Sequence, residues 1–452
     1  MAYILGVDIG TSGTKTVLFS EDGTPVASAT YEYPLYTPQN GYAEQEPLDW
    51  WNASVNGIKD VISQSNVSAD DIKGVGLSGQ MHGLVMLDAE NQPIRKSIIW
   101  CDQRTEKECE EITEKVGAKR LIEITANPAL TGFTASKILW VRNHEPENYA
   151  KCKHILLPKD YVRYILTGEF ATEVSDASGM QLLDVPKRQW SDEVLEKLDI
   201  DKNLLAKVYE SPEVTGKILP EIAAKTGLST ETVVVGGAGD NAAAAVGTGV
   251  VEDGKAFTTI GTSGVVFAHS NNISIDPKGR VHTFCCAVPG AWHVMGVTQA
   301  AGYSLAWFQE NIGTEYARKA KEQGCGAFDL INADVQKTPI GARLMIIIVI
   351  SIIMSLNWLK KFATVSARSP NFARITPMIN ANTMICSISP LARELIGLSG
   401  IIFNNVSVNE VAFMDSTDAA LVLIVLMSSP TPGLIRFPTD NATVTASAVV
   451  AR

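Results

Sequence analysis

The sequence Ile9-Gly10-Thr11-Ser12-Gly13 recurs letter for letter as Ile260-Gly261-Thr262-Ser263-Gly264. Each copy lies between two short runs of β-branched and apolar residues: 3–7 and 16–19, and 256–259 and 265–268. Such runs, separated by glycine and small hydroxyl residues, predict two β-hairpins. Because the match extends into the flanks, internal duplication is the better account of it. We therefore expect an α/β protein of two related domains, with the two turns facing each other across a cleft.

Length and composition fit this expectation. The chain has 452 residues, of which 46% are apolar and 35 are glycine, and single cores seldom exceed about 300 residues. The formal net charge is -11 and basic residues form no run, which excludes binding to nucleic acid or to an anionic membrane as the main function. Residues 1–8 contain no basic stretch followed by an apolar one, so we expect a cytoplasmic protein without a signal peptide.

The character of the sequence changes after Arg343. Residues 344–452 hold only 3 of the 35 glycines and no histidine. They contain two apolar blocks, 344–354 and 419–427, which are shorter than the roughly 20 residues of a membrane-spanning helix. We expect these blocks to form buried strands or helices, in a tail of unknown fold.

The two glycine-rich turns have the composition of phosphate sites. Glycine lets backbone N–H groups converge on one point, and threonine and serine hydroxyls add donors. The candidate phosphate ligands are Gly10, Thr11, Ser12 and Gly13 in the first turn and Gly261, Thr262 and Ser263 in the second. Asp8 adds a carboxylate suited to Mg²⁺ on a nucleotide phosphate. A plain hairpin turn explains one copy as well, but two copies favour phosphate binding.

A third motif places an acid at the end of a strand. The β-branched run 233–235 ends in Gly236 and Gly237, and Asp240 follows at the start of an alanine-rich helix. Ligands of α/β proteins gather at such strand ends. Asp240 is therefore a candidate general base, which the helix N-terminus is expected to keep ionised. The alternative is an aspartate that only caps the helix.

A fourth motif, residues 76–83, offers groups suited to sugar hydroxyls. Gln80 and His82 lie in this glycine-rich junction between two strands. Further on, Trp100, Asp102 and Arg104 supply the flat face, acid and base of a carbohydrate clamp. A structural role for His82 and a core position for Trp100 remain alternatives.

Residues 4 to about 343 closely resemble the FGGY carbohydrate kinases, on the segments 8–12, 236–241 and 260–264. The segments 78–83, 100–104 and 175–179 are similar to the xylulokinase branch of that family. The resemblance implies two domains of the ribonuclease-H-like, actin-like ATPase fold. It also implies that Met81, His82 and Asp240 contact D-xylulose, that Asp240 accepts the proton of the C5 hydroxyl, and that Asp8 helps to hold Mg·ATP. Gln80, Trp100, Asp102, Arg104 and Asn241 complete the expected sugar site.

The resemblance sets the expected domains and function. The expected first domain is 1–240 and holds the sugar site and the first phosphate loop. The second domain begins with 241–343, which holds the second phosphate loop, and the atypical tail is 344–452. Because the tail lacks the glycine-rich turn with which such kinases cradle adenosine, we expect the second domain to be incomplete or aberrant. The expected activity is ATP- and Mg²⁺-dependent phosphorylation of D-xylulose. The alternatives are a remnant that binds sugar without a complete ATP site and a kinase for another ketose or polyol. A homodimer is left open.

Overall fold

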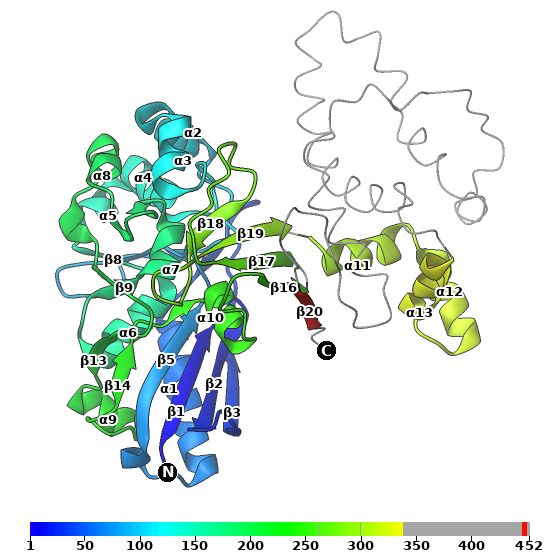
Figure 1. Ribbon diagram of the computed structural model, residues 1–452, viewed down its shortest axis with the longest axis horizontal. Coiled ribbons are helices and arrows are strands. Elements are labelled where there is room, and N and C mark those ends of the chain that lie inside the picture. The colour runs from blue at the N-terminus through cyan, green and yellow to red at the C-terminus, as the bar shows by residue number, and fades with distance from the viewer. Residues whose placement is uncertain (262, 299, 338–444, 450–452) are drawn as a thin grey trace, which may run out of the picture. The chain divides into compact units, whose positions relative to one another are not determined.

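A computed structural model describes residues 1–261, 263–298 and 300–337, and the backbone of 445–449 (Figure 1). These residues divide into two compact units. The first comprises Met1–Lys255 and Phe267–Met295, and the second comprises Ala256–Val266 and the residues from Gly296 onward. Each unit is described by itself.

The first unit is built on a mixed sheet. Its strands are β1 (Tyr3–Ile9), β2 (Gly13–Ser20), β3 (Pro25–Glu32), β5 (Ile72–Gly79), β13 (Val214–Lys217), β14 (Val233–Val235) and β15 (Ala238–Gly239). The order is β13-β14-β5-β1-β2-β3, with β15 also paired to β5. β1, β2 and β3 form an antiparallel meander, whereas β5 runs parallel to β1, β14 and β15. The predicted first hairpin is confirmed, and three antiparallel strands followed by parallel ones is the order expected of a ribonuclease-H-like domain.

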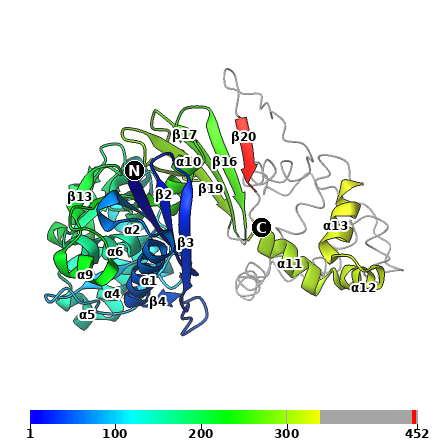
Figure 2. The same cartoon turned by 90° about the horizontal axis from the view of Figure 1, so that it is seen from below.

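Helices α1 (Pro47–Ser65), α6 (Pro158–Thr167) and α9 (Pro220–Thr226) pack together beside this sheet (Figure 2). A proline opens each helix, where its missing N–H costs no hydrogen bond. α1 buries Trp50, Val55 and Ile58 against the sheet core, and each such side chain stabilises the fold by roughly 1.5–3 kcal/mol.

A second layer of helices and short strand pairs covers the other end of the unit. The helices are α2 (Glu106–Val116), α3 (Ala118–Thr125), α4 (Thr134–His144), α5 (Pro146–Lys151), α7 (Val174–Ala177) and α8 (Asp192–Leu198), whereas α10 (Asp240–Gly247) packs against β5 and β15 of the main sheet. The strand pairs are β4 (Glu44–Gln45) with β7 (Ser97–Ile98), β6 (Val85–Leu87) with β8 (His154–Leu156), β9 (Ala171–Glu173) with β12 (Lys207–Tyr209), and β10 (Leu183–Asp184) with β11 (Gln189–Trp190). They enclose a separate apolar core that includes Ile112, Leu139 and Leu183.

A second sheet contains the other hairpin. Its order is β18 (His282–Cys285), β19 (Trp292–Thr298), β17 (Gly264–Ser270), β16 (Lys255–Ile260) and β20 (Thr445–Val449). The predicted strands at 256–259 and 265–268 are thus confirmed as β16 and β17. Helices α11 (Gly302–Asn311), α12 (Thr314–Gln323) and α13 (Ala327–Gln336) follow in the second unit.

Several predictions about domains stay predictions. The expected boundary after residue 240 falls inside α10, directly after its first residue, and the whole helix belongs to the first unit. Thr262 and the apolar blocks 344–354 and 419–427 lie outside the described residues, as does almost all of the predicted tail. Within the part of the chain that the structure describes, no helix is both long and apolar enough to cross a membrane.

Candidate active site

Three parallel strands end side by side at the candidate site. Asp8 of β1 pairs in register with Ser78 of β5, and Ser78 pairs with Ala238 of β15. Strand β15 ends at Gly239, the residue before Asp240. Ser78 Oγ donates a hydrogen bond to Asp8 Oδ1 at 2.8 Å. Asp8 is exposed and Asp240 is partly buried. The sheet therefore brings the two predicted acids to one edge.

Asp240 is the first residue of α10, and its N-cap is Gly239. The capping alternative therefore does not account for this carboxylate, whose Oδ1 accepts hydrogen bonds from the backbone N (2.7 Å) and Nδ2 (2.9 Å) of Asn241. Burial raises the pKa of Asp240 to about 6; the charge of Asp8 adds to the rise, and the bonds from Asn241 oppose it. The helix N-terminus was expected to keep Asp240 ionised, and with a pKa of about 6 the carboxylate is still mostly ionised at neutral pH. A pKa near neutrality suits a general base.

The segment that leads to Asp240 is fixed by its backbone. Gly237 has φ +72°, and a Cβ there would lie 2.2 Å from the carbonyl oxygen of Leu77, so only glycine fits. Arg163 donates to the carbonyl oxygen of Gly236 at 2.5 Å. Gly239 donates its N–H to Ser175 Oγ at 3.1 Å. These contacts restrain the backbone that leads to Asp240.

The first glycine-rich turn presents unpaired N–H groups. Gly10 N–H donates to the carbonyl oxygen of Gly13 at 3.0 Å, which closes the turn. Among the described residues, the N–H groups of Thr11 and Ser12 have no hydrogen-bond partner. Adjacent free N–H groups in a turn can form a concave anion site. Phosphate binding by this turn stays a prediction.

Polar side chains hold the carbonyl groups of the same turn. Tyr33 OH (2.5 Å) and Gln80 Nε2 (3.1 Å) donate to the carbonyl oxygen of Gly10, and Gln45 Nε2 donates to that of Thr11 at 2.7 Å. Trp100 Nε1 donates to Thr11 Oγ1 at 2.9 Å. Gln80 and Trp100 therefore support the phosphate turn, and their predicted contact with sugar stays a prediction. Buried Gln80 Oε1 has no partner among the described residues.

The second turn has a similar closure. Gly261 N–H donates to the carbonyl oxygen of Ser263 at 2.9 Å, and Gly302 N–H donates to that of Gly261 at 2.8 Å. Gly302 opens α11, so the turn lies at a helix N-terminus, where anions are favoured. The predicted Thr262 lies outside the described residues.

Met81 and His82 follow the end of β5, and Met81 lies against Gly239, the residue before Asp240. Met81 is buried, and its Cγ lies 2.9 Å from the position that a Cβ on Gly239 would occupy. His82 Nδ1 lies 2.8 Å from the carbonyl oxygen of Gly179, whose own Cβ would collide with the imidazole. Burial lowers the pKa of His82 to about 3, with a further contribution from the charge of Lys137. His82 is therefore neutral at physiological pH.

Asp102 and Arg104 form an ion pair with each other. Arg104 donates to both oxygens of Asp102 at 2.8–3.0 Å, forms an ion pair with Glu44 at 2.8 Å, and stacks on Tyr42. Asp102 also accepts from the backbone of Ala43 at 2.6 Å. Both side chains are buried, so this arrangement supports packing of the site wall, and their contact with sugar stays a prediction.

Sequence reasoning missed a buried charge network behind the strand ends. Lys159 Nζ lies within ion-pair distance of Asp160 (2.7 Å), Asp176 (3.0 Å) and Glu173 (3.3 Å), and all four side chains are fully buried. Desolvation and the neighbouring carboxylates raise the pKa of Asp176 to about 8. The only sequence signal was the motif 175–179, whose resemblance did not disclose its role.

Lys137 of α4 was missed as well. Its side chain is fully buried, and burial lowers its pKa to about 7, opposed chiefly by Asp102. A single lysine in the otherwise uncharged stretch 134–141 was the available signal.

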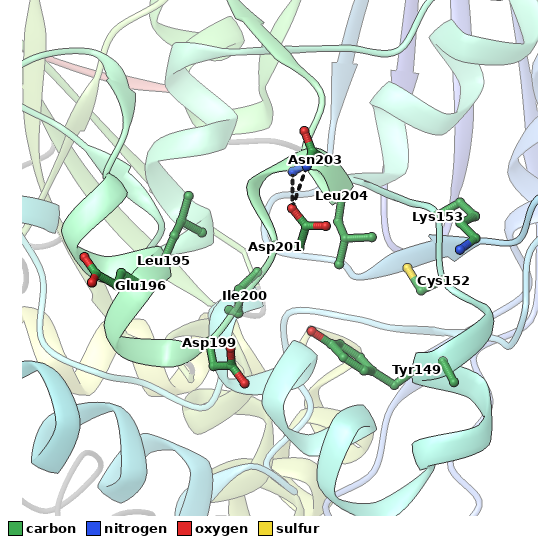
Figure 3. A pocket seen from close by; sticks show the side chains of 11 residues that line it. Tyr149, Cys152, Lys153, Leu195, Glu196, Asp199, Ile200, Asp201, Asn203 and Leu204 are labelled. Carbon is green, nitrogen blue, oxygen red and sulfur yellow. Dashed lines mark hydrogen bonds between the residues drawn. The ribbon is translucent and has the colours of Figure 1, made fainter.

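An open pocket of about 600 Å³ lies away from these residues, between α5, α8 and the segment after α8 (Figure 3). Tyr149, Leu195 and Ile200 line it together with Asp199 and Asp201. None of the predicted site residues contributes to this pocket.

Comparison with known proteins identifies the family. The model of the FGGY family of carbohydrate kinases, N-terminal domain, matches residues 3–247. The chain belongs to this family. Xylulose kinase of Bacillus subtilis is 42% identical over 343 residues, which are 76% of this chain and 66% of that protein. Xylulose kinase of Escherichia coli is 44% identical over 309 residues, 68% of this chain and 63% of that protein. The match thus spans less than two thirds of these relatives.

Solved structures confirm the fold of this FGGY-family chain. A "xyloylose kinase" from Brucella ovis superposes with a TM-score of 0.66 at 38% identity, covering 70% of this chain and 66% of that one. Xylulose kinase from Rhodospirillum rubrum superposes with a TM-score of 0.70 at 26% identity, covering 75% of this chain and 68% of that one. The predicted α/β class and actin-like ATPase fold are therefore confirmed for the matched region.

Proposed function

We propose that this FGGY-family chain transfers the γ-phosphoryl group of ATP to D-xylulose, giving D-xylulose 5-phosphate. The observation that carries the proposal is the sheet edge where Asp8, the first glycine turn and the start of α10 with Asp240 lie on neighbouring strand ends of one unit. Relatives that share this part of the chain are xylulose kinases.

Asp240 acts as the base in this proposal. A carboxylate with a pKa near 6 is mostly ionised at neutral pH and is basic enough to accept the proton of the attacking C5 hydroxyl. Asn241 restrains one carboxylate oxygen through two hydrogen bonds, which leaves the other for the sugar. The support of Gly237 and Gly239 keeps the base in place, and phosphoryl transfer depends mainly on such positioning and on charge stabilisation.

Each glycine turn, taken by itself, offers groups suited to nucleotide phosphates. The free N–H groups of Thr11 and Ser12 donate to phosphate oxygens, and the second turn offers the helix N-terminus at Gly302. Asp8 would hold Mg²⁺, because its exposed carboxylate lies beside the first turn and Mg²⁺ in proteins is commonly bound through one or two carboxylates together with substrate phosphates. When bound, the ion neutralises charge on the phosphates.

A second candidate function is sugar binding without efficient phosphoryl transfer. The change of composition after Arg343 and the missing glycine-rich turn favour it. Sugar recognition draws on the first unit, whereas adenosine recognition in such kinases draws on the segment that this tail replaces.

Two measurements separate the candidates. Calorimetry with D-xylulose tests the sugar site, and a coupled assay of ADP release with and without D-xylulose tests transfer. Sugar-dependent ADP release supports the kinase, sugar binding alone supports the second candidate, and the absence of both rejects each of them. A chimera that joins residues 1–343 to the C-terminal segment of the Bacillus subtilis xylulose kinase, hereafter the chimera, shows whether the tail limits the rate.

The identity of the sugar needs its own test. His82 accepts hydroxyls of many kinds, so other ketoses and polyols stay alternatives. A panel of pentuloses, hexuloses and polyols at fixed ATP should give D-xylulose the highest kcat/KM. The cytoplasmic location and a homodimer stay predictions.

A further inference from the structure

Lys137 makes two hydrogen bonds in the interior of the first unit. Its Nζ donates to the carbonyl oxygen of His82 at 2.8 Å and to that of Gly132 at 2.7 Å. Among the described residues it forms no ion pair, although its side chain is fully buried. Burial disfavours the charged form of this lysine, and the charge of Asp102 offsets that cost only in part. The hydrogen bond to the carbonyl oxygen of His82 indicates a role for this buried lysine.

The backbone of His82 requires such support. Its φ is +69°, a left-handed conformation that is uncommon for a residue with a side chain. Besides Lys137, Thr134 Oγ1 donates to the same carbonyl oxygen at 3.1 Å. Residues in sparsely populated conformations persist where the surroundings over-determine them, and such residues cluster at functional sites. Two donors on one carbonyl group provide that restraint.

The imidazole of His82 is restrained from the other side. The carbonyl oxygen of Gly179 can only accept, so His82 Nδ1, 2.8 Å away, must carry the proton. The ring lies against Phe133 and Phe284, with centroids 4.7 and 6.1 Å away. Because the ring is neutral, Nε2 keeps its lone pair and acts as a hydrogen-bond acceptor.

We propose that Lys137 is a positioning residue that, by anchoring the carbonyl group of His82, aims Nε2 of the imidazole as an acceptor at a hydroxyl group of the sugar. This deepens the proposed function and rests on it for the identity of the sugar. A hydroxyl can donate to Nε2, whereas a carbonyl or ether oxygen cannot. Lys137 thereby contributes to selection for a hydroxyl at that position without touching the sugar.

The experiment uses the full chain labelled with ¹⁵N-histidine. Two readouts are taken: calorimetry with D-xylulose, and the ring ¹⁵N shifts of His82, assigned from the spectrum of His82→Gln. Lys137→Met removes the hydrogen bonds of Lys137 to the carbonyl oxygens of His82 and Gly132, and Lys137→Arg keeps a side chain with N–H donors. Thr134→Val removes the hydrogen bond from Thr134 Oγ1 to the carbonyl oxygen of His82. Lys73→Met is the control, because Lys73 donates to a backbone carbonyl, that of Asp70, on the surface.

The unsubstituted chain should show the Nδ1–H tautomer of His82. Lys137→Met should weaken D-xylulose binding at least tenfold and shift the His82 ring signals towards a mixture of tautomers. Thr134→Val should do both to a smaller extent, Lys137→Arg should recover part of the affinity, and Lys73→Met should match the unsubstituted chain.

Other outcomes overturn the proposal or locate the failure. A folded Lys137→Met with unchanged affinity and unchanged His82 signals rejects the role of Lys137. If Lys137→Met does not fold, Thr134→Val decides, and unchanged values in both of its readouts reject the anchoring of His82. If the unsubstituted chain does not bind D-xylulose, the proposed function fails, while the ¹⁵N shifts still decide whether Lys137 positions the imidazole.

Discussion

Ser175 Oγ accepts a hydrogen bond from the backbone N–H of Gly239, 3.1 Å away and one residue before Asp240. Ser175 in turn donates to Glu173 Oε1 at 2.9 Å, and Glu173 lies 3.3 Å from Lys159 Nζ. The buried charges are thus connected to the candidate base by a single hydroxyl group. We therefore expect the network to affect catalysis as well as folding.

Replacing Ser175 by alanine should therefore slow turnover more than it weakens sugar binding. The loss of one hydrogen bond of about 1 kcal/mol corresponds to a roughly fivefold lower kcat, with the KM for D-xylulose little changed. Turnover is measured as sugar-dependent ADP release in the full chain or the chimera, whichever is faster. Ser211→Ala is the matched control, because Ser211 Oγ donates to Glu173 at 2.8 Å but does not contact Gly239. Equal effects of the two variants would assign Ser175 to folding alone.

The raised pKa of Asp240 predicts the acid limb of the pH profile. The base must be ionised to accept a proton, so kcat/KM should be constant at neutral pH and fall as the pH drops through about 6. Asp240→Asn should lower turnover by about 100-fold or more and abolish this limb, while sugar affinity changes little. An acid limb at pH 4, where an ordinary aspartate titrates, would show that desolvation of Asp240 does not govern the reaction.

His82 offers a test that needs no turnover. Its replacement by alanine removes the acceptor Nε2, and the loss of one or two hydrogen bonds should weaken D-xylulose binding by roughly 1–3 kcal/mol. Calorimetry measures this change. ADP release without sugar should be nearly unaffected, because no described contact joins His82 to the glycine turns. An unchanged dissociation constant would leave His82 as a structural residue.

The sequence predicted features that depend on local pattern. The hairpins around Gly10 and Gly261 and the helix that begins at Asp240 follow from glycine, β-branched runs and small residues, and all three are observed. Partners distant in sequence could not be predicted in this way. Arg104 is paired with Glu44, and Trp100 with Thr11, because the fold brings those segments together. The same limit concealed Lys137, whose sequence neighbours say nothing of His82.

The buried network predicts a large effect on stability. Lys159→Met would leave Asp160, Glu173 and Asp176 close together without the ammonium group that lies between them. Removing one partner of a buried ion network typically destabilises a protein by about 3–5 kcal/mol. Urea unfolding should show this loss in the free energy of unfolding at neutral pH. Lys187→Met is the control, because Lys187 pairs with Asp184 at the surface and should change stability by less than about 1 kcal/mol.

The composition of residues 344–452 leads to a prediction about the rate of sugar-dependent ADP release by the full chain. The glycine turns are expected to contact phosphate groups, but binding energy from the adenosine also helps to align the γ-phosphate for attack, and the residues after Arg343 lack the glycine-rich turn that supplies it in such kinases. We therefore expect little sugar-dependent ADP release from the full chain and a much higher rate from the chimera, with equal D-xylulose affinity in both, because the sugar contacts lie in the first unit. Asp240→Asn in the chimera should remove the restored activity, which shows that it comes from the base of this chain. A full chain as fast as the chimera would contradict the prediction and would mean that residues 344–452 supply the adenosine site by other means.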